Sequence, residues 1–132
     1  MLNLGLQFQP QNIVLDFERA MHAAVNSCWK NVNIFGCKFH LHQNWFRKIQ
    51  SLNLQQEYKN TNSIIGKYPK YYFGLCFLKP TDVTSFFETE LHYLIPQDGR
   101  VNKFRAYVLE NYIKTDAAFP PKMWAVYSHE LI

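Results

Sequence analysis

The chain has 132 residues and a mass of 15.7 kDa, which is an ordinary size for one domain. Nearly half of its residues are hydrophobic and 17% are aromatic, whereas only 18% are charged, so the composition excludes an intrinsically disordered chain. The 14 basic and 10 acidic residues leave a net charge of +4, which suits a polyanionic partner without identifying one.

Three cysteines, Cys28, Cys37 and Cys76, lack the dense spacing of a disulfide-rich secreted domain. They favour a reducing, intracellular compartment. No apolar run approaches the roughly 20 residues that a membrane helix needs, so we expect no membrane partner. The first ten residues have no basic segment followed by an apolar one, and we therefore expect no signal peptide.

The first third of the chain predicts two strands that alternate with two helices. Segments 12–15 and 32–35 are short β-branched runs, and Gly36 follows the second of them. After each run, apolar residues recur at steps of three and four, which predicts amphipathic helices. The first apolar stripe consists of Phe17, Ala20, Met21, Ala24, Val25 and Cys28. The second consists of Leu41, Trp45, Ile49 and Leu52. This alternation predicts an α/β fold with parallel strands.

Beyond residue 54 the sequence predicts helices and no strands. Segment 57–72 is polar, basic and rich in tyrosine, and an apolar patch at 71–78 precedes Pro80. Thr81 is a suitable N-cap for the next helix. The apolar residues of that helix are Val83, Phe86, Phe87, Leu91 and Leu94.

After a turn at 96–99, a further helix is marked by Val101, Phe104, Val108 and Tyr112. A last short helix is expected over 123–131, after Pro120 and Pro121. The one domain boundary that we predict lies near residue 54, between segments 1–54 and 55–132.

Asp16 follows the first predicted strand directly. A carboxylate at this point projects toward the crevice in which open α/β sheets bind ligands, where it can hold a divalent cation. Aspartate is also a preferred helix N-cap, and a helix is predicted to begin immediately after Asp16. Because such caps are common, capping is the stronger interpretation from the residues alone, and metal binding stays open beside it.

Cys37 and His40 form a Cys-x-x-His pair, whose thiolate and imidazole both suit zinc. A structural zinc site needs four ligands, and the other cysteines and histidines have no supporting spacing. A buried thiol beside a hydrogen-bonded histidine is therefore an equal alternative. A nucleophilic Cys37 in a small enzyme is the least favoured interpretation, because cysteine enzymes usually recruit a histidine from a distant part of the sequence.

Basic and aromatic residues are interleaved at 58–59 and 67–72. Lysines of such a segment can contact phosphates and its tyrosines can stack on bases. The same pattern also occurs on solvated helices whose aromatic rings pack inward. Arg47-Lys48 and Lys103-Phe104-Arg105 are interpreted as ordinary exposed helix positions.

Three sequence blocks, taken in order, closely resemble the MULE (Mutator-like element) transposase domain. They are Asp-Phe-Glu at 16–18, Gly-Cys-x-Phe-His at 36–40 and Phe-Pro-x-x-x-Trp at 119–124. The family consists of cut-and-paste DNA transposases with a ribonuclease H-like core, and the resemblance runs over nearly the whole chain. It implies that segment 1–54 is part of that core and that segment 55–132 is a helical insertion.

The resemblance also implies roles for individual residues. Asp16 matches the second of three carboxylates that bind two divalent metal ions, Mg²⁺ or Mn²⁺, for phosphodiester cleavage and strand transfer. Cys37 and His40 match the Cys-x-x-His element of the family, which is structural or linked to a metal such as zinc. DNA as the partner, self-association of the intact enzyme and a nuclear location follow from the same resemblance.

Two carboxylates of the family pattern have no counterpart in this sequence. The first aspartate belongs on a strand that would precede Met1, and the glutamate belongs to an Arg-Thr-Asn-Asn-x-x-Glu-like stretch after the Phe-Pro-x-x-x-Trp block. Glu130 lies too close to Trp124 to replace it. We therefore expect a transposase fragment that is inactive alone, because one carboxylate cannot assemble a two-metal site. The alternative is a domesticated, transposase-derived module that binds DNA or protein.

Overall fold

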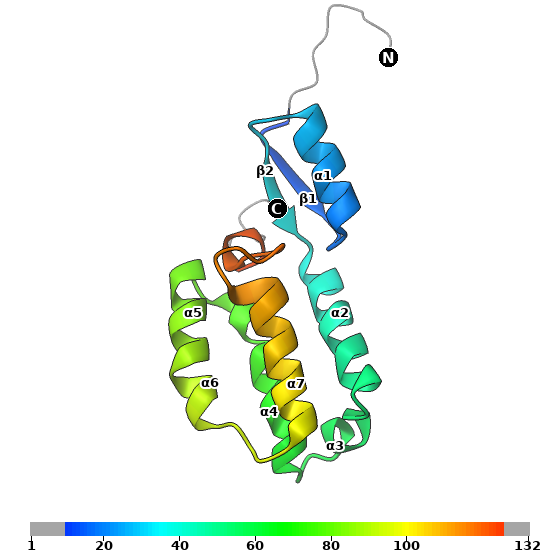
Figure 1. Ribbon diagram of the computed structural model, residues 1–132, viewed down its shortest axis with the longest axis vertical. Coiled ribbons are helices and arrows are strands. Elements are labelled where there is room, and N and C mark those ends of the chain that lie inside the picture. Colours follow the sequence, from blue (N-terminus) through cyan, green and yellow to red (C-terminus); the bar gives the residue numbers. More distant parts are fainter. Residues whose placement is uncertain (1–9, 126–132) are drawn as a thin grey trace, which may run out of the picture.

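The computed structural model describes residues 10–125 and shows an α/β protein whose small parallel sheet stands at one end of a helical body (Figure 1). The strand-helix-strand unit comprises β1 (Asn12–Leu15), α1 (Arg19–Cys28) and β2 (Asn33–Gly36). Ile13 pairs with Ile34 and Leu15 with Gly36 in the parallel register. The predicted alternation of strands and helices in this part of the chain is confirmed.

The helical body follows, and within residues 55–125 the structure contains helices and no strands, as predicted. Its α-helices are α2 (Lys38–Ser51), α3 (Gln55–Lys59), α4 (Ile64–Tyr72), α5 (Pro80–Glu88), α6 (Glu90–Tyr93) and α7 (Gly99–Val108). Shorter helical turns are η1 (Leu75–Phe77), η2 (Leu109–Ile113) and η3 (Pro121–Met123). Among the described residues, no helix is both long and apolar enough to cross a membrane.

The core lies between α2 and the helices that follow residue 54. Leu41, Trp45 and Ile49 of α2 are completely buried, which confirms the predicted stripe, and Leu52 packs against its edge. The same buried cluster includes side chains of α4, α5 and α7 on the other side of residue 54. These are Tyr68, Tyr72, Val83, Phe87, Val101, Phe104 and Val108. One continuous apolar cluster therefore supports both halves of the chain.

Phe17 joins the strand unit to the helical body. Its ring centroid lies 5.7 Å from that of Tyr112 and 5.2 Å from that of Phe119. Gly36, at the end of β2, leaves the space that this ring occupies, because a Cβ on Gly36 would lie 2.0 Å from Cζ of Phe17. The orientation of the sheet on the body thus depends in part on this aromatic ring and on the absence of a side chain at Gly36.

The predicted apolar face of α1 is largely wrong. Only Phe17 and Val25 of that stripe are buried, and the remaining buried residue of α1 is His22. The exposed members are Ala20, Met21, Ala24 and Cys28. The physical reason is that a sheet of two strands is narrower than the stripe, while the Phe119 ring packs against His22, 5.1 Å between centroids.

The predicted helix after Pro80 begins two residues earlier than an N-cap at Thr81 implies, and it divides into α5 and α6. Pro80 occupies the first turn of α5. Proline lacks a backbone N–H, but at this position the N–H would form no hydrogen bond within the helix. Lys79, and not Thr81, is therefore the N-cap residue. Thr89 Oγ1 donates to the Ser85 carbonyl, 2.8 Å away, and the chain bends there between α5 and α6. Of the helix predicted at 123–131, Met123 ends η3 and residues 126–131 lie outside the described part of the chain.

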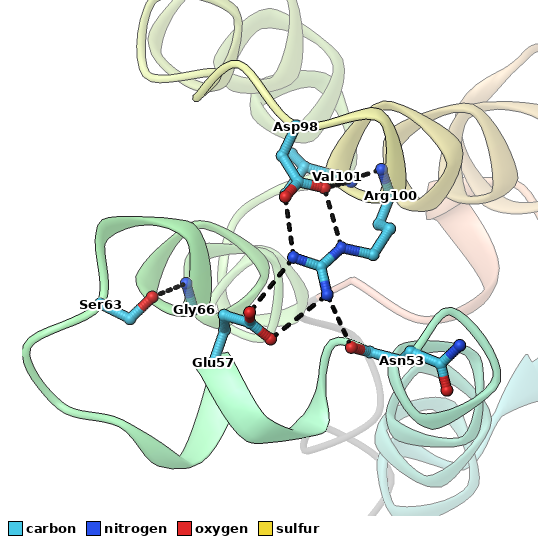
Figure 2. Close-up of polar contacts among 7 residues, drawn as sticks. All are labelled: Asn53, Glu57, Ser63, Gly66, Asp98, Arg100 and Val101. Carbon is cyan, nitrogen blue, oxygen red and sulfur yellow. Dashed lines mark hydrogen bonds and ion pairs between the residues drawn. The ribbon is translucent and has the colours of Figure 1, made fainter.

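Arg100 ties the start of α7 to two earlier segments (Figure 2). Its guanidinium donates to both carboxylate oxygens of Asp98 (3.1 and 2.8 Å), to Glu57 (3.2 Å) and to the Asn53 carbonyl (2.9 Å). Asp98 in turn accepts from the backbone N–H groups of Arg100 and Val101, so it caps α7. The Arg100 hydrogen bonds hold the pKa of Asp98 below its usual value.

Candidate functional site

The carboxyl ends of β1 and β2 meet at one edge of the sheet because the strands are parallel. Asp16 follows β1, and Cys37 follows β2. The Cys37 N–H donates to the Leu15 carbonyl at 3.0 Å, which continues the ladder past the last paired residues. The three residues proposed from the sequence, Asp16, Cys37 and His40, thus belong to two adjacent strand-to-helix connections.

Asp16 is half-exposed, and its carboxylate is held locally. Oδ1 accepts from the Phe17 N–H at 2.7 Å, whereas α1 begins at Arg19 with Glu18 at the N-cap position. Asp16 therefore does not occupy the N-cap that the capping interpretation gave it. One carboxylate oxygen has a backbone partner, and 44% of the side chain is open to solvent.

His40 faces Asp16 from the first turn of α2. Its Nδ1 lies 3.8 Å from Asp16 Oδ1, which is longer than a hydrogen bond, and the described residues provide no hydrogen-bond partner for this buried nitrogen. The pairing results from the fold, because Asp16 and His40 are 24 positions apart in sequence. When His40 is protonated, the two side chains form an ion pair in a partly solvated setting, where such pairs are weak.

His22 is a second histidine beside Asp16, and its position there was not predicted from the sequence. Its Nε2 lies 2.7 Å from the Asp16 backbone oxygen, so the ring N–H donates to this carbonyl. The ring is 6% exposed and packs on Phe119. The spacing of six residues between Asp16 and His22 carries no helical or strand period, so the sequence offered no signal for this contact.

Cys37 occupies the N-cap position of α2 without forming a side-chain cap hydrogen bond. Its thiol is partly exposed and reduced. Within residues 10–125, no three His, Cys, Asp or Glu side chains are grouped closely enough to hold a metal ion. The edge therefore presents one carboxylate and one imidazole nitrogen near each other, with Cys37 on the neighbouring connection.

A different cysteine pairs with a histidine inside the helical body. Cys76 Sγ lies 3.5 Å from His42 Nε2 and also donates to the Phe73 carbonyl at 3.5 Å. Burial raises the pKa of the Cys76 thiol and lowers the pKa of His42, with Lys38 lowering it further. Both shifts favour a neutral thiol and a neutral imidazole, whereas a nucleophile requires the thiolate. This pair is therefore a packing contact.

Only some rings of the tyrosine-rich segment are accessible for stacking on bases. Tyr68 and Tyr72 are buried in the core, where their hydroxyl oxygens are 3.0 Å apart and both accept from Arg105. Tyr71 is 45% exposed, and Lys70 lies over the Tyr58 ring. The inward-packed interpretation of segment 67–72 is thus the correct one for its two buried tyrosines.

The three sequence blocks described above pack against one another. Phe17 of the first block fills the space over Gly36 of the second, and its ring contacts Phe119 of the third. Trp124 Nε1 donates to the Phe119 carbonyl at 2.9 Å, and the Trp124 ring lies 5.6 Å from Trp45. Segments far apart in the sequence therefore pack around Phe17, the residue that follows Asp16.

In comparisons with known proteins, neither a family model nor a curated protein nor a solved structure matches this chain.

Proposed function

We propose that this chain is part of a MULE-type DNA transposase, in which Asp16 contributes one carboxylate to a divalent-metal site of a ribonuclease H-like core. The observation that carries the proposal is the position of Asp16 at the carboxyl edge of a parallel strand pair, with His40 3.8 Å away. Ligands of open α/β sheets bind at this edge. The mutual packing of the three blocks that resemble the family adds support.

The groups near Asp16 can supply some of the ligands of a metal site but not all of them. Mg²⁺ and Mn²⁺ prefer several oxygen ligands in octahedral geometry, whereas the described residues bring one carboxylate to this edge. Further carboxylates would have to come from elsewhere. No step of phosphodiester cleavage follows from Asp16 and His40 alone, so we expect the isolated chain to be inactive in cleavage.

Zinc at Cys37 and His40 remains a proposal for the same reason. The two residues occupy the N-cap and first turn of α2, and they supply at most two of the four ligands of a structural zinc site. A stoichiometric zinc content in the purified chain, lost in Cys37→Ser, would support a ligand role. If metal analysis finds no zinc in the purified protein, Cys37 and His40 have a packing role and are not zinc ligands.

The alternative function, a DNA-binding module without cleavage, is favoured by the charge distribution. Between Glu18 and Glu57 the sequence contains no acidic residue, while it carries the cations Arg19, Lys30, Lys38, Arg47 and Lys48. This segment includes all of α1, β2 and α2. A polyanion would therefore be attracted to this segment, which follows Asp16 in the sequence.

The metal part of the proposal is tested by titrating Mn²⁺ into the full chain and following amide NMR signals. We expect paramagnetic broadening centred on Phe17 and Cys37, and its loss in Asp16→Asn. Asp116→Asn is the matched control, because Asp116 is an exposed carboxylate elsewhere in the chain. Broadening that survives Asp16→Asn, or that is absent from this edge, would contradict the assignment of Asp16.

The DNA part is tested with supercoiled plasmid and Mn²⁺. We expect salt-dependent retention of duplex DNA without nicking. Nicking that disappears in Asp16→Asn would show that the chain assembles a complete active site, which would overturn the expected inactivity. A chain that retains no DNA at low salt would contradict the DNA part of the proposal and the DNA-binding form of its alternative, while the Mn²⁺ titration tests the metal part separately.

A further inference from the structure

A shallow, open groove of about 290 Å³ lies between α2 and the end of α7. Its walls are Asn44, Arg47, Lys48 and Ser51 of α2, together with Tyr107 of α7. The four α2 residues are spaced i, i+3, i+4 and i+7, so they form one stripe beside the buried stripe of the same helix. Every lining side chain carries a hydrogen-bond donor, two of them are cations, and no carboxylate lines the groove.

Four of the five side chains that line this groove contact neighbouring residues of the protein. Lys48 Nζ lies 5.1 Å from the centroid of the Tyr107 ring, a cation–π distance. Ser51 Oγ donates to the Lys48 carbonyl at 2.9 Å. Asn44 Nδ2 donates to the hydroxyl of buried Tyr112 at 3.4 Å, and this hydroxyl also lies 3.4 Å from that of Tyr107. Asn44, Lys48 and Tyr107 are thus held in place before any ligand arrives, whereas Arg47 is exposed beside them.

The two cations are not neutralised by neighbouring acids. Within residues 10–125 neither Arg47 nor Lys48 forms an ion pair, and α2 contains no acidic residue. Glu110, one turn beyond Tyr107, forms an ion pair with Lys114, with 2.6 Å between Oε1 and Nζ. Lys48 in the last turn of α2 also stabilises the helix dipole, but that role leaves the charge available to an anion.

The groove and the Asp16 edge share one side of α2. His40, Asn44, Arg47 and Ser51 follow steps of four, three and four residues, so they lie on one stripe of the helix. Seven residues separate His40 from Arg47, which is about 10 Å along the helix axis. A nucleic-acid strand that reaches the Asp16 edge can therefore continue along α2 into the groove.

We propose that this groove binds the phosphate backbone of duplex DNA, with Arg47 and Lys48 as the principal contacts. The proposal rests on the proposed function, since it takes DNA as the partner. The planar guanidinium of Arg47 suits bidentate contact with a phosphate, and Lys48 supplies a point charge. Asn44 and Tyr107 are uncharged side chains beside them that carry further hydrogen-bond donors. Such contacts position the backbone without selecting a base sequence.

The experiment measures the affinity of the full chain for a duplex oligonucleotide by fluorescence anisotropy over a series of salt concentrations. The double variant Arg47→Gln/Lys48→Gln removes both cations of the groove. A matched control, Lys67→Gln/Lys79→Gln, removes two exposed cations elsewhere, and Lys79 precedes α5 on the side of the body away from α2 (Figure 1). Arg47→Lys/Lys48→Arg conserves the charge, and circular dichroism verifies the fold of each variant.

We expect the groove variant to bind about tenfold more weakly at low salt, and its log–log salt dependence to become shallower by about 2, close to 0.9 for each lost phosphate contact. The control variant should keep nearly the slope of the parent, and the charge-conserving variant should retain binding.

Equal losses in the groove and control variants would overturn the proposal, because they would reflect net charge alone. Unchanged binding in the groove variant would also overturn it while DNA binding itself stands. Tighter binding of an RNA duplex would overturn the choice of DNA. If the parent chain binds no duplex at all, this proposal and the DNA part of the proposed function fail together, whereas loss of Mn²⁺ broadening in Asp16→Asn tests the metal part separately.

Discussion

Phe17 and Gly36 determine how the candidate site is oriented on the molecule. The Phe17 ring fills the place of a Gly36 side chain and contacts Phe119 behind it. Asp16 precedes this anchored ring and uses one oxygen to accept from the Phe17 N–H. A displacement of the ring would therefore move the carboxylate relative to His40.

The variant Gly36→Ala tests this anchoring. A Cβ at residue 36 would lie 2.0 Å from Phe17 Cζ, so we expect the free energy of unfolding to fall by about 1–3 kcal/mol through overpacking. Gly99→Ala is the control, because a Cβ at the exposed start of α7 meets no atom within 4 Å. Urea unfolding measures both variants. Equal free energies of unfolding for the two variants would show that the Phe17 ring can move aside without destabilising the protein.

At the scale of elements, the ends of the helices are held by side chains from distant segments. Arg100 links α7 to α3 and to the Asn53 carbonyl after α2, and Asn53 itself has a left-handed φ of 61°. Ser63 Oγ caps α4 by accepting from the Gly66 N–H (Figure 2). Arg105 donates to the Phe87 carbonyl near the end of α5 and lies over the Phe87 ring. These contacts set the positions of short helices that would be marginal alone.

The capping carboxylate Asp98 makes stability depend on pH in acid. Its pKa is lowered in the folded protein, so its stabilising effect is present above the unfolded value of about 4 and is lost as pH falls through the lower folded value. Asp98→Asn keeps a good N-cap but removes the charge, so it should be less stable than the parent at about pH 6 and nearly equal to it in strong acid.

Asp98→Ala removes the cap as well and should lose about 1 kcal/mol more than Asp98→Asn. Unfolding midpoints in urea across the acid range measure the three proteins. A difference between the parent and Asp98→Asn that stays constant as pH falls would contradict a role for the charge.

At the scale of the whole molecule, burial is unevenly distributed. Residues of β1, α1 and β2 contribute few buried side chains, whereas α2, α4 and α7 contribute many to the buried cluster, Trp45 of α2 among them. Regions with few buried contacts open more easily than the core. Phe17 is the one side chain of the strand unit (residues 12–36) in the buried cluster, so opening of this unit need not unfold the helices.

Native-state hydrogen exchange tests this distribution. We expect amides of 12–36 to exchange at least about tenfold faster than those of α2 and α7, because local opening there disrupts less apolar contact. Phe17→Leu should accelerate exchange in the strand unit further and leave α4 nearly unchanged. Uniform protection over residues 12–125 would mean that the sheet and the helical body open as one unit.

Local patterns were sufficient where a segment's own neighbours decide its structure. The β-branched runs around Val14 and Ile34 and the stripe from Leu41 to Leu52 predicted β1, β2 and α2, because period and propensity act within one element. The prediction failed at α1, where the width of the sheet decides which face is buried, and at Thr81, where Pro80 takes the first turn of the helix.

The candidate site divides in the same way. The sequence by itself determined that Asp16 and Cys37 follow two strands and that no acidic residue lies between Glu18 and Glu57. Only the tertiary structure decided that His40 and His22 flank Asp16, that Cys76 rather than Cys37 meets a histidine, and that Arg47 and Lys48 line a groove with Tyr107. The physical reason is that contacts between elements depend on packing of the shared core, and no period along one segment encodes them.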